Sequence, residues 1–418
     1  MRQFSLILFL VILFHLEAKQ LKVNVSARSA ILINADTGAI LYEKDPHFLC
    51  SPASITKIAT ALYVLEKKEK ELDQLLTASQ EAVGVVSPQV RAKHPSYRLT
   101  SDGTHMELKA GEIMPLRALM YGLLLASGND AANVIAEYVS GSVPKFVEDM
   151  NLYLREKGAL ATHFSNPHGL PHPEHVTTAW DMAHIMKEAL KKPFFREVIK
   201  TVQYPRPQTN KHPPGLIHQK NRLIKPGPLF YPKAIGGKTG FTNSGPTLVE
   251  AAQDGERTLI AVIIYAEATQ RFREATLLFE TAFAEQKVMR TLLTKEYDHF
   301  TLSLKGGTTA LEASLNQDLT IAYFPSEEPE LKAFLLWDSC PLPIAKGAHV
   351  GEVQLKTPQG QIFKTAPLYA IKPVDKTTSL RLRESLLQAK NYLIQKKLWL
   401  LLLLIISLIV LRLSKKKS

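Results

Sequence analysis

Residues 52–58 of this 418-residue chain read PASITKI, and this stretch decides how the sequence around it is interpreted. Ser51 is a favourable helix N-cap and Pro52 suits the first helical position, so a helix is predicted to begin here. Its predicted apolar face comprises Ile55, Ile58, Ala59, Leu62 and Leu65. Ser54 and Lys57 are three residues apart in the first turn, so they share one face and the Lys57 amine can reach the Ser54 hydroxyl.

This spacing makes Ser54 and Lys57 a candidate pair of nucleophile and general base. A serine hydroxyl is a weak nucleophile until a base takes its proton. A lysine can be that base only if burial or a neighbouring cation lowers its pKa. Because a chain of this length contains about one or two Ser-x-x-Lys strings by chance, the string alone is equally compatible with a solvated helix start.

A second polar string, Ser127-Gly128-Asn129, interrupts two apolar segments that are predicted to be helices, residues 116–125 and 129–139. Polar groups at such a break must be satisfied by hydrogen bonds. The string can be an ordinary capping turn. It can also supply a hydroxyl for a proton relay and an amide that binds substrate and holds Lys57.

A third string, Lys238-Thr239-Gly240, lies on a predicted strand and follows Gly236-Gly237. Glycines at this place let a backbone or a ligand approach closely. The lysine and the threonine would offer a carboxylate a positive charge and a hydroxyl. The alternative is a plain strand end, although chance gives this string in only about one chain in ten of this length.

The segments around these strings predict an α+β fold in which helices flank an antiparallel sheet. Residues 29–33 and 40–42 read as a hairpin. Further strands are predicted at residues 234–240, 247–252 and 259–266, with turns at 243–245 and 254–255. These short turns favour antiparallel pairing, and a helix over residues 272–285 follows them.

The C-terminal third of the chain has a different pattern of apolar residues. Residues 291–376 carry short alternating apolar runs punctuated by Gly and Pro, which predicts a small all-β module. A helical stalk is predicted next, at residues 377–397. Its apolar face comprises Leu382, Leu386, Ala389 and Leu393. An apolar stretch follows at residues 398–413, and a short basic tail comes after it.

Both ends of the chain carry membrane signals. A basic start, an apolar run at residues 6–14 and a small residue at Ala18 predict a secretory signal peptide, residues 1–18. The C-terminal stretch is short for a spanning helix, which needs about 20 residues, but basic flanks can snorkel outward. We expect it to anchor the chain in the cell membrane, with the body on the extracytoplasmic side and Lys415–Lys417 in the cytoplasm. A helix lying in the interface is the alternative.

Composition narrows the class of protein. With 45% hydrophobic and 22% charged residues, the chain can bury a core and is not disordered as a whole. The net charge of +12 is not gathered in a basic run interleaved with aromatic residues, so no nucleic-acid partner is predicted. The two cysteines, Cys50 and Cys340, make neither a disulfide framework nor a metal motif.

Four histidines, at positions 163, 168, 172 and 175, raise the question of a metal site. Pro167, Pro171 and Pro173 exclude a regular helix and hence a helical pair of histidine ligands. No cysteine lies nearby and the spacing fits no known zinc motif. We therefore predict no metal and no cofactor.

Taken together and in this order, the three strings resemble the low-molecular-weight penicillin-binding proteins of the D-alanyl-D-alanine carboxypeptidase family. The blocks that carry the resemblance are residues 52–58, 127–132, 166–171, 178–183, 221–223 and 237–242. The resemblance extends to the β module and the C-terminal anchor, so it covers nearly the whole mature chain. One departure is Gly245-Pro246, which is expected to alter the strand pairing there.

The resemblance implies five segments and a β-lactamase/transpeptidase-like fold for the largest of them. The implied segments are a signal peptide (1–18), a serine D,D-peptidase domain (23–290), a small β-sandwich-like domain (291–376), a helical stalk (377–397) and a membrane anchor (398–413).

The resemblance also implies a role for each matching site residue. Ser54 would be the nucleophile, Lys57 its general base, Ser127 a proton relay, Asn129 the ligand of the substrate amide, Lys238 and Thr239 the carboxylate holders, Ser54 and Phe241 the oxyanion-hole donors, and Arg273 a further carboxylate contact. The implied reaction removes the terminal D-alanine from peptidoglycan pentapeptide stems, which would lie extended beside the Lys238 strand. β-Lactams would acylate the same serine.

Other activities use the same residues and stay open. A D,D-endopeptidase would cut cross-links with this set, and a penicillin-binding scaffold would hold wall peptides without turnover. A β-lactamase needs an efficient deacylating base. Glu174 is the only tempting acid, and no Asn follows it four residues later. The oligomeric state and the third residue of the stem peptide are left open.

Overall fold

The computed structural model describes residues 12–13 and 19–414, and the chain divides into two compact units. The sheet–helix unit comprises Ala18–Gln286 with Phe324–Glu327, and the β unit comprises Lys287–Tyr323 with Glu328 onward and a short N-terminal piece. Apart from Ile12–Leu13, the expected signal peptide lies outside the described residues, as do Lys415–Lys417. The predicted border at residue 290 lies close to this division.

A five-stranded antiparallel sheet forms the centre of the sheet–helix unit. Its strands, in spatial order, are β10 (Ala234–Thr242), β11 (Gly245–Asp254), β12 (Arg257–Ile264), β2 (Ser29–Asn34) and β3 (Ile40–Lys44). The predicted hairpin and the three consecutive strands are therefore confirmed. β10 is an edge strand, so one side of its backbone is not paired within the sheet.

The expected disturbance at Gly245-Pro246 is wrong. Thr242 pairs with Gly245 and Phe241 with Pro246, and the only register shift between β10 and β11 lies at Ala234/Gly236. The carbonyl of Pro246 accepts a hydrogen bond from the Tyr265 N–H at 2.9 Å, on the β12 side. In a strand, the N–H of a residue points to the same side as its C=O, so the donor that proline lacks is missing on the β12 side and the pairing with β10 is kept.

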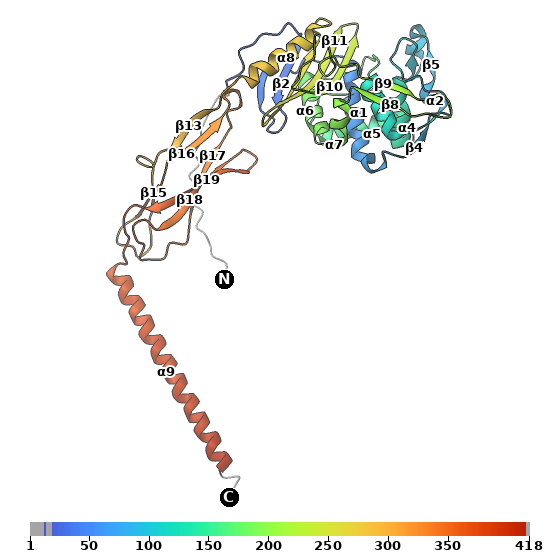
Figure 1. Ribbon diagram of the computed structural model, residues 1–418. Coiled ribbons are helices and arrows are strands. Elements are labelled where there is room, and N and C mark those ends of the chain that lie inside the picture. Colours follow the sequence, from blue (N-terminus) through green and yellow to red (C-terminus); the bar gives the residue numbers. More distant parts are fainter. Residues whose placement is uncertain (1–11, 14–18, 415–418) are drawn as a thin grey trace. The chain divides into compact units, whose positions relative to one another are not determined.

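Helices cover both faces of this sheet (Figure 1). Ile260, Val262 and Ile264 of β12 pack in one core with α1 (Thr56–Lys68) and α6 (Ala179–Leu190). The alternate residues Leu259, Ala261 and Ile263 pack in a second core with α8 (Gln270–Phe283). Burial on both faces explains why the central strand reads as an almost continuous apolar run.

The two apolar helices predicted around Ser127 are present, with one feature that was not predicted. The first consists of α3 (Leu116–Tyr121) and a π-helical segment, η4 (Gly122–Ala126). The second is α4 (Asn129–Ser140), which ends at Gly141 in the left-handed conformation (φ 80°). The π-helical segment ends at Ser127, which adopts the left-handed conformation (φ 64°).

The remaining elements of this unit surround the helices. They are η1 (Ala53–Ile55), η2 (Glu69–Glu71), β4 (Leu75–Thr77), α2 (Gln80–Val83), β5 (Val85–Val86), η3 (Pro88–Lys93), β6 (Leu99–Thr100), β7 (Ile113–Pro115), α5 (Val143–Glu156), α7 (Pro193–Lys200), β8 (Gln203–Arg206), β9 (Gly215–His218) and η5 (Pro325–Glu327).

The β unit is all-β apart from its last helix, as predicted. Its strands are β13 (Val288–Leu293), β14 (His299–Leu302), β15 (Leu311–Leu315), β16 (Leu319–Tyr323), β17 (Lys332–Trp337), β18 (His349–Lys356) and β19 (Ile362–Ala370). A six-stranded sheet runs β1-β17-β18-β19-β15-β14, where β1 is Ile12–Leu13, and β13 pairs with β16. Buried and partly exposed side chains alternate along β17, and the last of them, Trp337, is buried. One face of this strand therefore packs on the core of the β unit.

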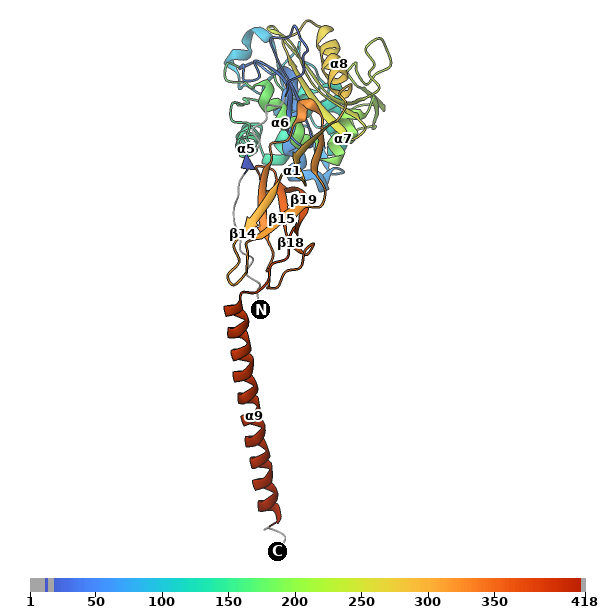
Figure 2. The same ribbon diagram turned by 90° about the vertical axis from the view of Figure 1, so that its left-hand side faces the viewer.

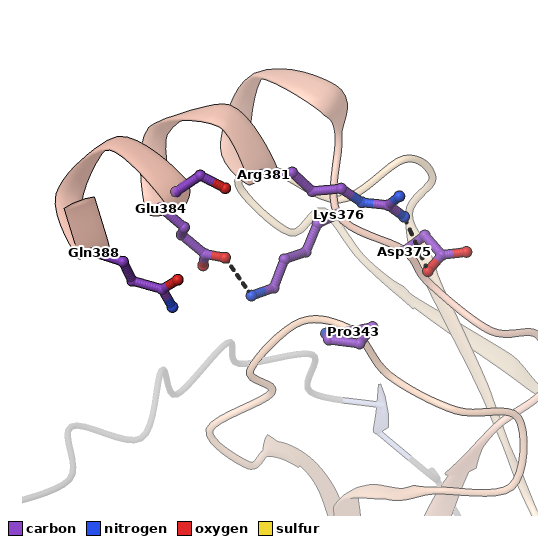
Figure 3. A pocket seen from close by; sticks show the side chains of 7 residues that line it. Pro343, Asp375, Lys376, Arg381, Glu384 and Gln388 are labelled. Atoms are coloured by element: carbon purple, nitrogen blue, oxygen red, sulfur yellow. Dashed lines mark hydrogen bonds and ion pairs between the residues drawn. The ribbon is translucent and has the colours of Figure 1, made fainter.

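The predicted stalk and anchor form one uninterrupted helix, α9 (Thr378–Ser414), seen in Figures 1 and 2. Within the described part of the chain, it is the helix long and apolar enough to cross a membrane. Its start is tied down by two ion pairs, Lys376–Glu384 at 2.6 Å and Arg381–Asp375 at 3.5 Å. These residues border a shallow pocket of about 420 Å³ with Pro343 (Figure 3).

Candidate active site

The helix start that carries Ser54 differs from the prediction. Ser51 is not an N-cap: its hydroxyl has no hydrogen-bond partner, and its N–H donates to the Tyr265 hydroxyl at 2.8 Å. The chain instead forms the 3₁₀ turn η1, and α1 begins only at Thr56. The reason is Ala53, whose φ of 55° interrupts the helical path directly before Ser54. Such a conformation is costly for a residue with a side chain and is often found at functional sites.

Lys57 is fully buried beneath this turn. Its Nζ donates to Asn129 Oδ1 at 2.7 Å and to the His168 carbonyl at 2.6 Å, and it lies 3.0 Å from Ser54 Oγ. A neutral amine has two N–H donors and one lone pair. Because both other partners are acceptors only, the lone pair of a neutral Lys57 faces Ser54 Oγ.

The environment favours that neutral form. Burial lowers the pKa of Lys57 well below its usual range, and the positive charges of Lys238 and Lys220 lower it further. Asp130 opposes this shift. Its carboxylate accepts hydrogen bonds from the N–H groups of Met106 and Leu108, both within 3.0 Å, and so also fixes the neighbouring loop.

The second string lies beside Lys57. Ser127 and Asn129 are buried, and the Asn129 N–H donates to the Thr104 carbonyl at 2.8 Å. The left-handed conformation at Ser127 turns the chain from η4 into α4, so a hydroxyl and an amide reach the same cleft. The two-helix interpretation of the sequence placed this string at the break correctly.

The third string lies on the edge strand β10. Lys238 is buried, its Nζ donates to the Thr239 carbonyl at 2.8 Å, and burial, with Lys220 and Arg271 nearby, lowers its pKa to about 7. Gly240 allows η1 to pack against the strand, because a Cβ there would lie 2.9 Å from the Pro52 carbonyl oxygen.

These three strings line one cleft of about 560 Å³. The residues that line it are Ala53, Ser54, Asp102, Gly103, Thr104, Ser127, Asn129, Gly169, Leu170, Pro171, Lys220, Thr239, Gly240, Phe241, Thr242, Asn243 and Arg271. Lys57 and Lys238 lie directly behind this lining. Seven of the eight site residues proposed from the sequence are thus brought together, and the Phe241 side chain is exposed at the rim.

Arg273 is the exception. It is exposed on α8 and does not line the cleft, whereas Arg271, two residues earlier, does. Arg271 donates from Nη1 to the Gly240 carbonyl at 3.0 Å, and burial lowers its pKa to about 10. Side chains two positions apart on a helix point in different directions, so the rotation of α8 about its axis decides which arginine faces the cleft.

Lys220 is the second lining cation that the sequence analysis missed. It directly precedes the block at residues 221–223, so adjacency to that block was an available signal. With Lys238 and Arg271 it makes the surroundings of the cleft positive. Asp102 is the single acidic residue among the lining residues. Such a site suits a ligand that carries a carboxylate.

The histidines hold the loop at residues 163–176 together. The His168 ring bonds to the Tyr97 carbonyl at 3.0 Å through Nε2 and accepts from the Leu170 N–H at 3.1 Å through Nδ1. Among residues 12–13 and 19–414, no cluster of three or more His, Cys, Asp or Glu side chains is arranged to hold a metal ion. Cys50 and Cys340 are both free thiols, Cys50 buried and Cys340 partly exposed.

Comparisons with known proteins find similar chains. A family model described as D-alanyl-D-alanine carboxypeptidase matches residues 16–268. The carboxypeptidase DacF of Bacillus subtilis is 30% identical over 82% of this chain and 85% of its own length. The carboxypeptidase DacD of Salmonella typhimurium is 27% identical over 84% of this chain and 87% of its own.

Solved structures show the same fold. Penicillin binding protein 6B from Escherichia coli is 25% identical, with a TM-score of 0.59 over 84% of this chain and 96% of that chain. Penicillin binding protein 5 from Haemophilus influenzae is also 25% identical, with a TM-score of 0.57 over 85% of this chain and 99% of that chain.

Proposed function

Because the chain belongs to the D-alanyl-D-alanine carboxypeptidase family, we propose that it removes the terminal D-alanine from peptidoglycan pentapeptide stems through an acyl-enzyme on Ser54. The observation that carries this proposal is the 3.0 Å separation of Ser54 Oγ from the buried Nζ of Lys57. As a member of a penicillin-binding family, the protein is acylated by β-lactams at the same serine.

Acylation begins with proton transfer from Ser54 to Lys57. Ser54 Oγ then bonds to the carbonyl carbon of the penultimate D-alanine, and the negative charge moves onto its oxygen. The N–H groups of Ser54 and Phe241 stabilise that oxyanion, which is the type of interaction that contributes most to such reactions. A lysine works as this base only with a lowered pKa, and burial supplies that condition.

The leaving group needs a proton before the C–N bond breaks. Ser127 passes the proton from Lys57 to the nitrogen of the departing D-alanine, while Asn129 holds the amide of the remaining peptide. A water molecule then attacks the ester carbonyl, Lys57 again takes the proton, and Ser54 is regenerated as the shortened stem leaves.

Substrate orientation depends on its terminal carboxylate. Lys238 and Thr239 bind that group, and Arg271 takes the place that the sequence analysis gave to Arg273. The stem peptide extends along the unpaired edge of β10, where its backbone adds a strand to the sheet. A D,D-endopeptidase would use the same groups on a cross-linked stem.

The cellular location follows from α9 and the expected signal peptide. The protein is exported, α9 anchors it in the cell membrane, and the sheet–helix unit works on the extracytoplasmic side. The support for this is the exposed apolar surface of α9, none of which is buried within the protein.

One experiment tests the reaction. The full chain in detergent is incubated with fluorescent penicillin and, separately, with a pentapeptide that ends in D-Ala-D-Ala while free D-alanine is measured. Ser54→Ala should abolish both signals. Ser51→Ala is the matched control and should retain them, because that nearby hydroxyl has no partner. Labelling without D-alanine release would favour the endopeptidase or the scaffold, and labelling of Ser54→Ala would place the nucleophile elsewhere.

A further inference from the structure

A chain of buried hydrogen bonds ends at the carbonyl beside Ser54. His175 and Thr56 are both fully buried. The Ser165 N–H donates to His175 Nδ1 at 2.9 Å, so the proton of the neutral ring is on Nε2. Nε2–H then donates to Thr56 Oγ1 at 2.9 Å. The Thr56 hydroxyl in turn donates to the carbonyl of Ala53 at 2.8 Å.

The Ala53 carbonyl is not an arbitrary acceptor. It belongs to the peptide group whose N–H is that of Ser54, and in a planar trans peptide the C=O and the N–H point in opposite directions. Whatever fixes the Ala53 oxygen therefore aims the Ser54 N–H. The φ of 55° at Ala53 is unfavourable, so contacts beyond the single backbone bond from the Thr56 N–H help to hold this orientation.

The surroundings leave the Ala53 carbonyl little other freedom. A Cβ at Gly169 would lie 1.9 Å from its oxygen, so the backbone of the 166–171 loop packs directly against it. On the other side of η1, the Thr247 hydroxyl donates to the Pro52 carbonyl at 3.0 Å. With Ala53 itself buried, this oxygen accepts from two donors of Thr56, its backbone N–H and its hydroxyl, and only the hydroxyl links it to His175.

We propose that Thr56 and His175 are positioning residues of the oxyanion hole, which hold and polarise the Ala53–Ser54 peptide so that the Ser54 N–H points at the developing charge. This inference rests on the proposed acyl-transfer function. Hydrogen bonds in series strengthen one another in a low-dielectric interior, so donation to the carbonyl makes the N–H of the same peptide a better donor. Neither side chain touches the substrate.

His175 suits this role because it stays neutral. Burial, followed by the nearby His172 and His163, lowers its pKa to about 3. The ring also stacks on Phe164 with a centroid separation of 5.0 Å, which fixes its plane. The same tautomer therefore persists over the pH range in which Lys57 can work.

The test is infrared spectroscopy of the acyl-enzyme formed with a slowly hydrolysed β-lactam, together with the acylation rate. Hydrogen bonds in an oxyanion hole weaken the ester C=O bond. Thr56→Val removes the hydroxyl but keeps the shape, so the ester band should move to higher wavenumber and acylation should slow by about tenfold, part of the loss seen when a whole donor is removed. Thr56→Ser should restore both.

Matched variants separate this role from general stability. Thr60→Val, one turn later on α1, removes the equally buried hydroxyl that donates to the Pro167 carbonyl at 2.6 Å. It should lower the melting temperature as much as Thr56→Val without moving the ester band. His175→Phe should move the band in the same direction as Thr56→Val, but less, because the Thr56 hydroxyl is still present.

Each other outcome contradicts the inference. An unchanged ester band in Thr56→Val would show that the peptide is held without the hydroxyl. A shifted acid limb of the pH profile with an unchanged band would show that Thr56 acts through Lys57 instead. Failure of the unmodified protein to form any acyl-enzyme would contradict the proposed function itself, and the wild-type spectrum reveals that case before any variant is compared.

Discussion

The Nζ atom of Lys57 lies 3.0 Å from Ser54 Oγ, and its two remaining hydrogen-bond directions are taken by acceptors. Within the described chain, this geometry gives the serine a base that is already in place. Lys57→Met should therefore reduce β-lactam acylation by about two to four orders of magnitude. Stopped-flow fluorescence of a labelled penicillin measures the rate.

The same variant should not unfold the protein. Burial lowers the pKa of Lys57, so folding favours loss of the proton that the unfolded chain holds at neutral pH, and an apolar side chain of similar length removes the cost of that loss. The variant also leaves Asn129 Oδ1 and the His168 carbonyl without the Lys57 donor, which opposes the gain. Because these two effects oppose each other, we expect the melting temperature of Lys57→Met to stay within a few degrees of that of the wild type. A modest change in acylation would mean that another group is the base.

Lys220 should set the pH at which acylation begins. Its positive charge lowers the pKa of both Lys57 and Lys238. Lys220→Met should raise the pKa of Lys57, and because only the neutral amine can take a proton, the acid limb of the acylation profile should move to higher pH. Lys220→Arg keeps the charge and should leave the limb in place. A limb that does not move in Lys220→Met would rule out this coupling.

Two arginines on α8 provide a test variant and its control for carboxylate binding. Arg271 borders the cleft and Arg273 is exposed away from it. Arg271→Ala should raise KM for a pentapeptide with a free terminal carboxylate by roughly tenfold, the loss of one charged contact. It should change KM much less for the corresponding C-terminal amide. Arg273→Ala should change neither value, and the reverse pattern would restore the sequence-based assignment.

Glu250 is a buried carboxyl on β11 that the proposed mechanism does not use. One of its oxygens accepts from Asn221 Nδ2 at 2.6 Å, and the other has no partner. Burial raises its pKa to about 8. The folded protein therefore binds a proton that the unfolded chain releases above about pH 4.5, so this group lowers stability as pH rises from there to about 8.

Glu250→Gln imitates the protonated form. At pH 7 it should raise the free energy of unfolding by on the order of 3 kcal/mol, and at pH 5 the gain should nearly vanish. Thermal unfolding at both pH values measures the difference. Glu174→Gln, at an exposed glutamate, is the control and should show no such pH dependence. An equal gain at both pH values would mean that Glu250 is ionised in the fold.

Removing residues 398–418 should release an active protein. The apolar part of α9 is exposed along its length, so its loss exposes no core. The truncated protein should appear in the soluble fraction with unchanged penicillin labelling, while deletion of residues 415–418 alone should leave it in the membrane. An inactive, aggregated product would show that the helix contributes to the fold.

Regular periodicity made most of the fold predictable. The alternating strands from residue 234 to 266 and the apolar helices on either side of Ser127 follow from local pattern, and the structure has them within a few residues. The helix start at Ser51-Pro52 was wrong, because the left-handed Ala53 is imposed by tertiary contacts of η1 with Gly169 and Gly240. No local propensity of alanine signals such a conformation.

The candidate site was predictable where a residue belongs to a short string and less so elsewhere. Ser54, Ser127 and Thr239 come from such strings and share one cleft. Arg271 and Lys220 depend on the rotation of a helix and the path of a loop, which a single sequence does not fix. The link from His175 to Thr56 joins residues 119 positions apart, so only the folded chain reveals it.

The continuity of α9 has a mechanical consequence. Its 37 residues include neither glycine nor proline, which would interrupt the helix. The part of α9 outside the bilayer therefore sets both the distance of the attached β unit from the membrane and its rotation about the helix axis. Each residue contributes about 1.5 Å of rise and about 100° of turn. Deleting one stalk residue would thus lower the attached β unit only slightly but swing it through more than a quarter of a revolution about the helix axis. A small change in stalk length therefore alters the direction in which the β unit faces much more than it alters the distance of this unit from the membrane.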